Sequence, residues 1–296
     1  MGEELIEPAT AAEHPRLAFL YVLASECFLR GRLEQGHPVL RAGQIALVNT
    51  DEMAGHGYEG LLGNAYLLIG QPQRWVEACE AQLQRRDDTA VRIRSCLVYA
   101  LTLAGRCDEA MAAANGLLEA AEATSNAALL SGTLLAYGVA FREADPDRAA
   151  DAFRRGLVVA EESGSRTSEL AVGLARIEAD NGDTASAFDH ATLGLRNYHD
   201  SGSATAMRSP LAVVATMFDR LGRVEPAATI AGFALNPMTA TLPEFTIAIT
   251  HLRDVLGDQT YESLAHKGET MTTAEMVTYA YDQIDQARTE LNPVSE

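Results

Sequence analysis

Positive charge is scarce in this chain of 296 residues. Lys and Arg together number 23 against 41 Asp and Glu, which gives a formal net charge of −18. An excess of this sign repels the phosphates of nucleic acids and the headgroups of anionic lipids. The composition therefore predicts no direct nucleic-acid binding and no membrane partner, and it favours a basic partner or a basic neighbouring domain. Lys267 is the only lysine, so any mechanism that needs a lysine must use it.

Cysteine pairs and long apolar runs are also missing. The four cysteines, at positions 27, 79, 96 and 107, form no CxxC motif, which favours small core residues of a reduced protein over a disulfide framework. No apolar run approaches the roughly 18 residues of a membrane-spanning helix. The acidic N-terminus lacks the apolar core of a signal peptide. These absences predict a soluble, cytoplasmic protein.

The sequence contains none of the common catalytic or cofactor motifs. Residues 55–60 match the string GxGxxG, but no strand pattern precedes them, as a dinucleotide site requires. Lys267 is followed by Gly268 rather than by Ser or Thr, so it does not complete a phosphate-binding loop, and no His/Cys cluster has metal-ligand spacing. We therefore predict that the chain is not an enzyme and holds no cofactor or metal. Four histidines that lie near acidic residues are expected at the surface or at helix ends: His190, His199, His251 and His266.

The chain does contain abundant alanine and a repeated helical pattern. Aromatic residues make up 6% and apolar residues 47%, and many alanines with few β-branched runs favour closely packed helices. A small residue follows the first helix of six successive helical hairpins, at separations of 39, 35, 39, 38 and 40 residues. A period of this length is typical of stacked helical hairpins. The six turn residues are Gly31, Gly70, Gly105, Ala144, Gly182 and Gly222.

Early in the second helix of each hairpin, the residue five positions beyond the turn is small in five of the six units. These residues are Gly36, Trp75, Ala110, Ala149, Ala187 and Ala227. Small side chains at these positions let two helices approach closely. The expected helices include 108–123 as one element, 146–162 with Asp145 as its N-cap, and a C-terminal group at 244–256, 259–266 and 274–288. We expect a turn at Gly268, and a capping box between Thr272 and Glu275 at the start of the last helix.

Parts of the sequence resemble known repeat proteins. Leu62-Gly63-Asn64-Ala65-Tyr66, followed by Gly70, resembles the consensus of tetratricopeptide repeats, although most of the periods here exceed the usual 34 residues. Over residues 221–281 the chain resembles the C-terminal helical region of bacterial LuxR-type regulators and related STAND ATPases, some of which carry an adenylate cyclase domain. The resemblance implies a regulatory role beside a nucleotide-binding domain and a winged helix. The ATPase itself is not expected in this chain.

Together these patterns predict an all-α fold: a right-handed superhelix of about six tetratricopeptide-like hairpins with a C-terminal helical cap. The predicted organisation is a flexible segment at 1–13, a repeat domain at 14–235 and capping helices at 236–296. The predicted function is a non-catalytic interaction or sensor module that binds a protein partner, a linked ATPase domain or a small effector. The alternative is a small-molecule or catalytic site in the bowl of the superhelix.

In such a stack, the positions 13, 10, 6 and 3 residues before each turn line one groove. Tyr, Asn and Arg side chains there can hold a peptide or a small polar ligand. The alternative interpretation is that these polar side chains merely satisfy one another. The candidate groove residues are Tyr21, Ser25, Asn64, Arg92, Ser95, Tyr99, Glu169 and Arg176.

Overall fold

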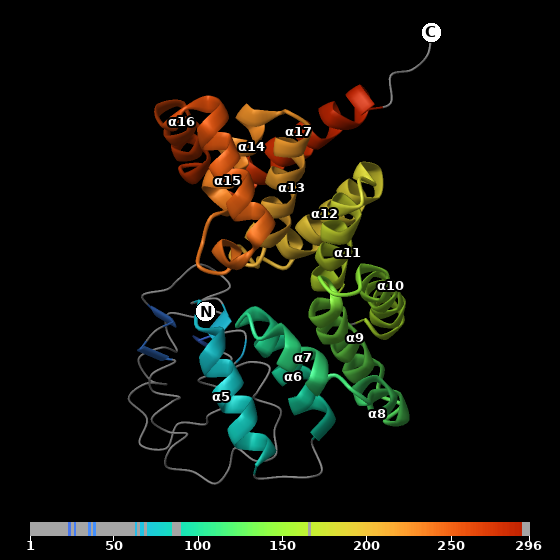
Figure 1. Cartoon of the computed structure of the whole chain (residues 1–296). Coiled ribbons are helices and arrows are strands. Elements are labelled where there is room, and N and C mark those ends of the chain that lie inside the picture. The colour runs from blue at the N-terminus through green and yellow to red at the C-terminus, as the bar shows by residue number, and fades with distance from the viewer. Residues whose placement is uncertain are drawn as a thin grey trace. The chain divides into compact units, whose positions relative to one another are not determined.

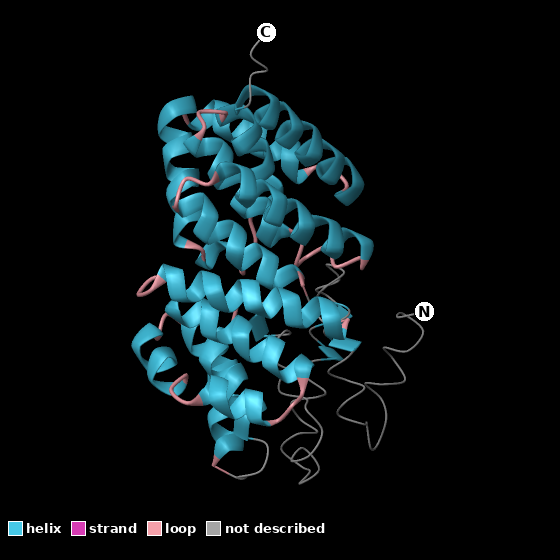
Figure 2. Ribbon diagram, turned by 90° about the vertical axis from the view of Figure 1, so that its right-hand side faces the viewer, coloured by secondary structure: helices cyan, strands magenta, loops and turns pink. Residues whose placement is uncertain are grey.

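The structure, a computed structural model, describes residues 70–84, 90–164 and 167–291 and ten single positions before Gly70. Every regular element in these residues is a helix (Figures 1 and 2), which confirms the predicted all-α class. None of the described helices has both the length and the hydropathy that crossing a bilayer requires.

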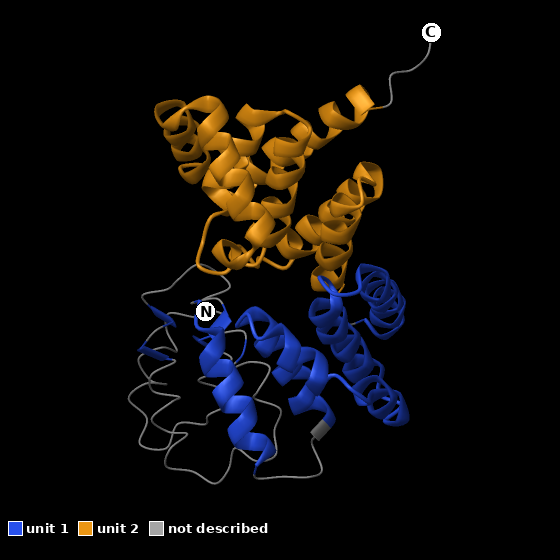
Figure 3. Ribbon diagram, viewed as in Figure 1, with its two compact units in different colours: residues 1–165 blue, residues 166–296 orange. Residues whose placement is uncertain are grey.

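The chain divides into two compact units, residues 1–165 and residues 166–296 (Figure 3). The division falls inside the predicted repeat domain, between its fourth and fifth hairpins. Unit 1 contains α5 (Pro72–Leu83), α6 (Ala90–Leu103), α7 (Cys107–Ala113), α8 (Leu117–Ala123), α9 (Ala127–Phe141) and α10 (Pro146–Ser163). Unit 2 contains α11 (Ser168–Asp180), α12 (Thr184–Asp200), α13 (Arg208–Arg220), α14 (Val224–Ala234), a 3₁₀ turn η2 (Thr239–Thr241), α15 (Pro243–Leu256), α16 (Asp258–Glu269) and α17 (Thr273–Leu291).

The helix junctions fall at the predicted turn residues. Gly70, Gly105, Gly182 and Gly222 have φ values of 71°, 77°, 79° and 71°, a left-handed conformation that glycine adopts without the steric cost of a Cβ. At all four turns the next amide donates to a carbonyl five residues back, at 2.8–2.9 Å. Ala144 carries a Cβ and has no positive φ, so its hairpin closes instead through Asp145 N–H to the Phe141 carbonyl, at 2.8 Å. Gly31 lies outside the described residues.

The two helices of a hairpin pack closely where one side is glycine. In the pair α9–α10, a Cβ on Gly138 would lie 2.5 Å from a ring carbon of Phe153, so the phenyl ring fills the space that glycine leaves. Trp75, the one bulky residue in the row of small ones, is accommodated in the same way, because a Cβ on Gly63 would lie 2.0 Å from its indole. Ala149, at the same hairpin position, is fully buried.

The expected single helix 108–123 is wrong, because the structure breaks it into α7 and α8. Gly116 has a φ of 68°, which ends the helical path between them. The Arg94 guanidinium of α6 donates to the carbonyls of Ala113 and Asn115, at 3.0 and 2.8 Å. These carbonyls lie at the break, and the arginine satisfies them there.

The predicted turn at Gly268 is also wrong. Gly268 is buried inside α16, where a Cβ would lie 1.8 Å from the carbonyl oxygen of Thr229 on α14. Gly232 of α14 meets the backbone of Ala265 in the same way, at 2.0 Å. The two glycines therefore let the backbones of α14 and α16 come into direct contact, and Gly268 does not turn the chain.

Two predicted helix starts are confirmed. The Asp145 carboxylate accepts from Arg148 N–H at 3.1 Å, ahead of Pro146 at the first position of α10. At the start of α17, Glu275 Oε2 accepts from the backbone N–H of Thr272 at 2.8 Å, and Thr272 Oγ1 accepts from Glu275 N–H at 3.3 Å. This reciprocal pair is the capping box expected from the sequence.

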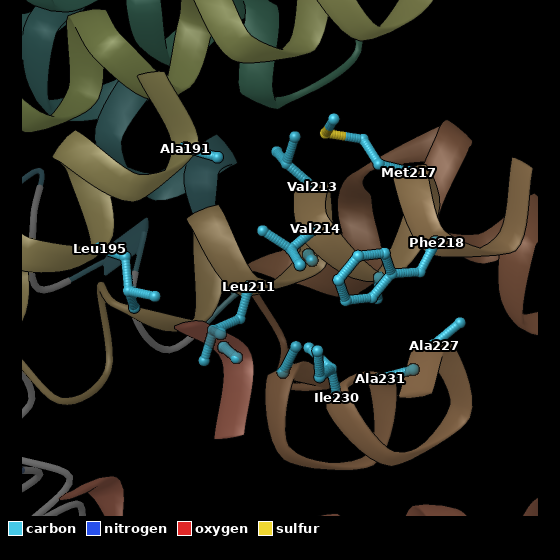
Figure 4. Close-up of a cluster of buried hydrophobic side chains, with 14 of the residues drawn as sticks. Ala191, Leu195, Leu211, Val213, Val214, Met217, Phe218, Ala227, Ile230 and Ala231 are labelled. Atoms are coloured by element: carbon cyan, nitrogen blue, oxygen red, sulfur yellow. The ribbon is translucent and has the colours of Figure 1, made fainter. Parts of the chain in front are cut away.

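Helix α13 is the centre of unit 2. Its residues from Pro210 to Phe218 are all buried, and it packs against α11, α12, α14 and α15. Phe218 meets Phe188 of α12 with ring centroids 5.7 Å apart, and Phe218 and Leu211 point toward Ile230 of α14 (Figure 4). The buried helix fixes α11 and α15 beside it, and these three helices carry the site described next.

Candidate functional site

The first helices of the hairpins in unit 2 lie beside one another. Helices α11 and α15 both pack on α13, and α15 ends before Gly257, whose φ is 76°. Gly257 lies 35 residues beyond Gly222, so the hairpin period continues one step further than the six predicted units. We define the first-helix face as the positions 13, 10, 6 and 3 before Gly182, Gly222 and Gly257.

An ion pair joins the two outer helices of this face. Arg176 Nε of α11 donates to Glu244 Oε1 of α15 at 2.5 Å, and the two side chains are 15% and 14% exposed. A pair so poorly exposed is screened less than a surface pair. Losing one partner would therefore leave a half-buried charge with less compensation. The pair thus ties α11 to α15 while remaining at the surface of the face.

A histidine–carboxylate pair joins α13 to α15. Oδ1 of Asp219 lies 2.8 Å from Nδ1 of His251. The Asp219 side chain is 9% exposed and the His251 side chain is 55% exposed. A carboxylate in this position fixes the orientation of the imidazole and leaves its Nε2 side toward solvent. The prediction of a surface histidine holds for His251, and the structure adds a buried acidic partner from the neighbouring helix.

Arg220 makes a third link across the face. Its guanidinium donates to the carbonyl of Ala179 at 2.8 Å and to Asp180 at 2.7 Å. Both acceptors belong to the C-terminal end of α11, where helix carbonyls lack partners of their own and a positive charge is favourable. Adjacent first helices are therefore held by side chains as well as by the apolar core.

One exposed apolar side chain lies on the α15 part of the face. Ile247, one turn from Glu244 and one turn from His251, is 68% exposed. Thr216 of α13 is buried, and its hydroxyl donates to the Ala212 carbonyl of the same helix at 2.9 Å. Exposed apolar surface bordered by fixed polar groups is the usual arrangement of a protein-binding surface.

Two of the predicted groove residues are satisfied within the protein. Ser95 is buried, and its hydroxyl lies 2.8 Å from Thr133 Oγ1 of α9, so it joins two helices and is closed to a ligand. Arg176 is held by Glu244, as described. The alternative interpretation, that such side chains satisfy one another, describes both of them.

The other predicted residues fall in different settings. Arg92 of α6 is exposed. Tyr99 is half-buried, with its ring edge-on to Trp75 at 5.7 Å between centroids. Glu169 is half-buried on α11, 13 residues before Gly182. Tyr21, Ser25 and Asn64 lie outside the described residues. Unit 1 thus brings Arg92 and Tyr99 onto α6, and unit 2 brings Glu169 and Arg176 onto α11.

Sequence reasoning missed the contribution of α15. Counting 13, 10, 6 and 3 residues back from Gly257 gives Glu244, Ile247, His251 and Asp254, of which two make the interhelical pairs. The available signal was Gly257 itself, one period beyond Gly222. This signal is weak because the second helix after Gly257 lacks small residues: Glu262 and His266 stand five and nine positions beyond it.

The polar side chains described in unit 2 pair mainly between helices. In the described part of the chain, no group of three or more His, Cys, Asp or Glu side chains could hold a metal ion. His190 is partly exposed, and its Nδ1 lies 2.7 Å from Oε2 of the buried Glu178 within the hairpin α11–α12. These pairs leave Ile247 and Asp254 of the first-helix face exposed.

No model of a known protein family matches the chain, and no curated protein matches it in sequence. The resemblance to LuxR-type and STAND regulators therefore stays a prediction from the quoted residues.

Proposed function

We propose that the chain is a non-catalytic helical-repeat module that binds a segment of a protein partner on its first-helix face. The observation that carries the proposal is the face of unit 2. There, Arg176–Glu244 and Asp219–His251 hold α11, α13 and α15 together, and Ile247 is exposed on α15 between Glu244 and His251. Fixed side chains lower the entropy lost on binding, and an exposed apolar side chain supplies burial energy.

The proposal includes the finer architecture: the hairpins stack in a right-handed, tetratricopeptide-like superhelix whose groove is lined by the first helices. The support is the spacing of the turn residues and the left-handed glycines found at them. It also includes a cytoplasmic setting within a signalling or transcription-regulatory system. Partner binding there would bias a linked or separate ATPase between two states, because a ligand shifts an equilibrium by its differential affinity for the two states.

A selection experiment tests whether the face binds peptides. The full chain is immobilised and used to select from a displayed library of random peptides, and the selected peptides are measured by fluorescence polarisation against the chain and its Ile247→Ser variant. The module predicts enriched peptides that lose affinity for the variant. A library that yields no enriched binder would overturn the proposal.

A thermal-shift experiment separates the small-effector and catalytic alternatives from peptide binding. Binding to the folded chain raises the melting temperature by mass action. The proposal predicts a rise with a selected peptide. A rise with ATP or a cyclic nucleotide, accompanied by release of product, would instead indicate an enzyme.

A further inference from the structure

Helix α15 has one outward side whose residues are exposed. Its inward side is set by Phe245, Ala248 and Leu252, which are all buried. Opposite them, at helical spacing, lies a row that we call the α15 stripe: Pro243, Thr246, Ile247, Thr250 and Asp254, all exposed. Ile247, at 68%, is the most exposed large apolar residue in the part of the chain that the structure describes.

The two threonines of the α15 stripe behave as apolar residues. Thr246 Oγ1 donates to the Pro243 carbonyl at 2.9 Å, and Thr250 Oγ1 donates to the Thr246 carbonyl at 3.0 Å. Each hydroxyl is therefore satisfied by the backbone of its own helix, which leaves the methyl group for a partner. β-branched side chains have few rotamers to lose, so ordering Thr246, Ile247 and Thr250 against a partner costs little entropy.

The charge around the stripe is negative. Asp254 ends it, at the C-terminal part of the helix, where the helix dipole is also negative. Arg253, the only cation of α15, is turned to Asp258 and Glu262, at 3.1 and 2.5 Å, and lies over the ring of Tyr261.

We propose that the α15 stripe docks a basic amphipathic helix of another protein. The apolar side of that helix covers Ile247 and the threonine methyls, and its Arg or Lys side chains pair with the exposed Asp254. A row at positions i, i+4, i+7 and i+11 is the contact pattern of one helix on another. A second copy of this chain is a poorer occupant, because two chains of net charge −18 repel each other.

The inference rests on the proposed function, because Ile247 belongs both to the first-helix face and to the α15 stripe. It adds the chemistry of the partner and the helix on which it lies. The proposed function fails if no peptide binds the chain at all, whereas this inference fails if peptides bind but neither basic charge nor α15 matters.

The test uses the full chain and a synthetic amphipathic peptide of about 15 residues, long enough to form a helix, made of Leu, Ala and Arg. Affinity is measured by fluorescence polarisation at physiological ionic strength. We expect Ile247→Ser to weaken binding by about tenfold or more, since an anchor side chain contributes roughly 1.5–3 kcal/mol when buried. Asp254→Asn should weaken binding roughly two- to fivefold, as one exposed charge pair does.

Matched controls separate docking on α15 from general attraction to an acidic protein. Val158→Ser removes another exposed apolar side chain, 56% exposed on α10, and Asp282→Asn removes an exposed carboxylate on α17. Both should leave the affinity unchanged. The same peptide with Glu in place of Arg should not bind.

Three results would overturn the inference. The Arg peptide could bind Ile247→Ser as tightly as the unchanged chain, or the Glu peptide could bind as well as the Arg peptide. In the third, sedimentation of the unchanged chain shows a dimer that Ile247→Ser dissociates, which would make a second copy the occupant. If the random-peptide selection succeeds alongside any of these results, the module stands and only the partner assignment is lost.

Discussion

Glycine meets two opposite needs in this protein. At Gly105, Gly182 and Gly222 the backbone has a positive φ and nothing lies within 4 Å of where a Cβ would be, so the constraint there is conformational. At Gly138, Gly232 and Gly268 a Cβ would overlap a neighbouring helix, so the constraint there is space. The same residue type therefore fixes both the turns and the closest helix contacts.

Two glycine-to-alanine substitutions separate the energetic cost of a positive φ from the effect of replacing a glycine inside a helix. Gly105→Ala should lower the free energy of unfolding by about 1–2 kcal/mol, because an L-residue pays that penalty in the left-handed region. Gly132 lies exposed inside α9 with open space around it, so Gly132→Ala should be neutral or stabilise by up to about 1 kcal/mol. Urea unfolding measures both, and equal stability of the two variants would contradict the assigned turn.

The ion pair Arg176–Glu244 gives a second test at this scale. Arg176→Ala leaves the poorly exposed Glu244 without this partner, so we expect a loss of about 1–3 kcal/mol in the free energy of unfolding. The exposed pair Arg154–Asp151, with side chains 58% and 82% exposed, is the control. Arg154→Ala should change stability by less than about 1 kcal/mol. Similar losses in both variants would show that Arg176 makes no special link between α11 and α15.

At the scale of elements, the helices of the C-terminal group differ in how they attach. Helix α16 crosses α14 backbone to backbone at Gly232 and Gly268. Helix α17 instead packs on α12 and α14 and adds side-chain ties, among them Arg288 to Asp189 at 2.5 Å and Arg223 to Gln283 at 3.1 Å. The backbone crossing of α14 and α16 leaves no room for an added atom, whereas the side chains that hold α17 can change conformation.

Gly268→Ala should therefore be among the most damaging single changes in unit 2. The added methyl would meet the Thr229 carbonyl oxygen at 1.8 Å, and a backbone atom cannot move aside as a side chain can. We expect a loss of about 1–3 kcal/mol or more in the free energy of unfolding, measured by urea unfolding. Stability equal to that of Gly132→Ala would contradict the close crossing of α14 and α16.

Three tyrosines of the C-terminal helices should make the stability of the folded chain fall at alkaline pH. Burial is the main cause that raises the pKa of Tyr261 on α16 and of Tyr279 and Tyr281 on α17. Each phenol is thus harder to ionise in the folded chain than in the unfolded chain. Their contribution to stability is full below about pH 10, the ordinary tyrosine value, and is lost as the pH rises through the folded values.

Ultraviolet absorbance of the phenolate, followed against pH together with circular dichroism, checks this expectation. Part of the tyrosine titration should be delayed and should coincide with loss of helicity. Complete ionisation at the ordinary tyrosine pKa with the helices intact would show that these rings are not buried in unit 2.

For the whole molecule, the repeat could be predicted because it depends on local rules. The turn at Gly222 followed from a small residue between two helical patterns, and the structure has it there with a positive φ. The break at Gly116 and the role of Gly268 could not be predicted. Each depends on a partner far away in the sequence: the Arg94 guanidinium in one case and the Thr229 carbonyl in the other.

The candidate site shows the same limit. Spacing from the turns placed Arg176 on the first-helix face, but it could not show that Glu244, 68 residues later, neutralises it. Ser95 satisfied the same spacing and is closed by Thr133. Position along a repeat thus predicts which face a residue occupies, whereas its availability depends on the neighbouring helix.

We propose that the first-helix face of unit 2 is the surface that binds a partner. Photo-crosslinking tests it directly: a photoreactive residue replaces Ile247 in one variant and Val158 in another, and each is irradiated with a peptide selected on the unchanged chain. The account predicts a peptide adduct from position 247 and none from position 158. An adduct from position 158 alone, with the peptide still bound to both variants, would contradict it.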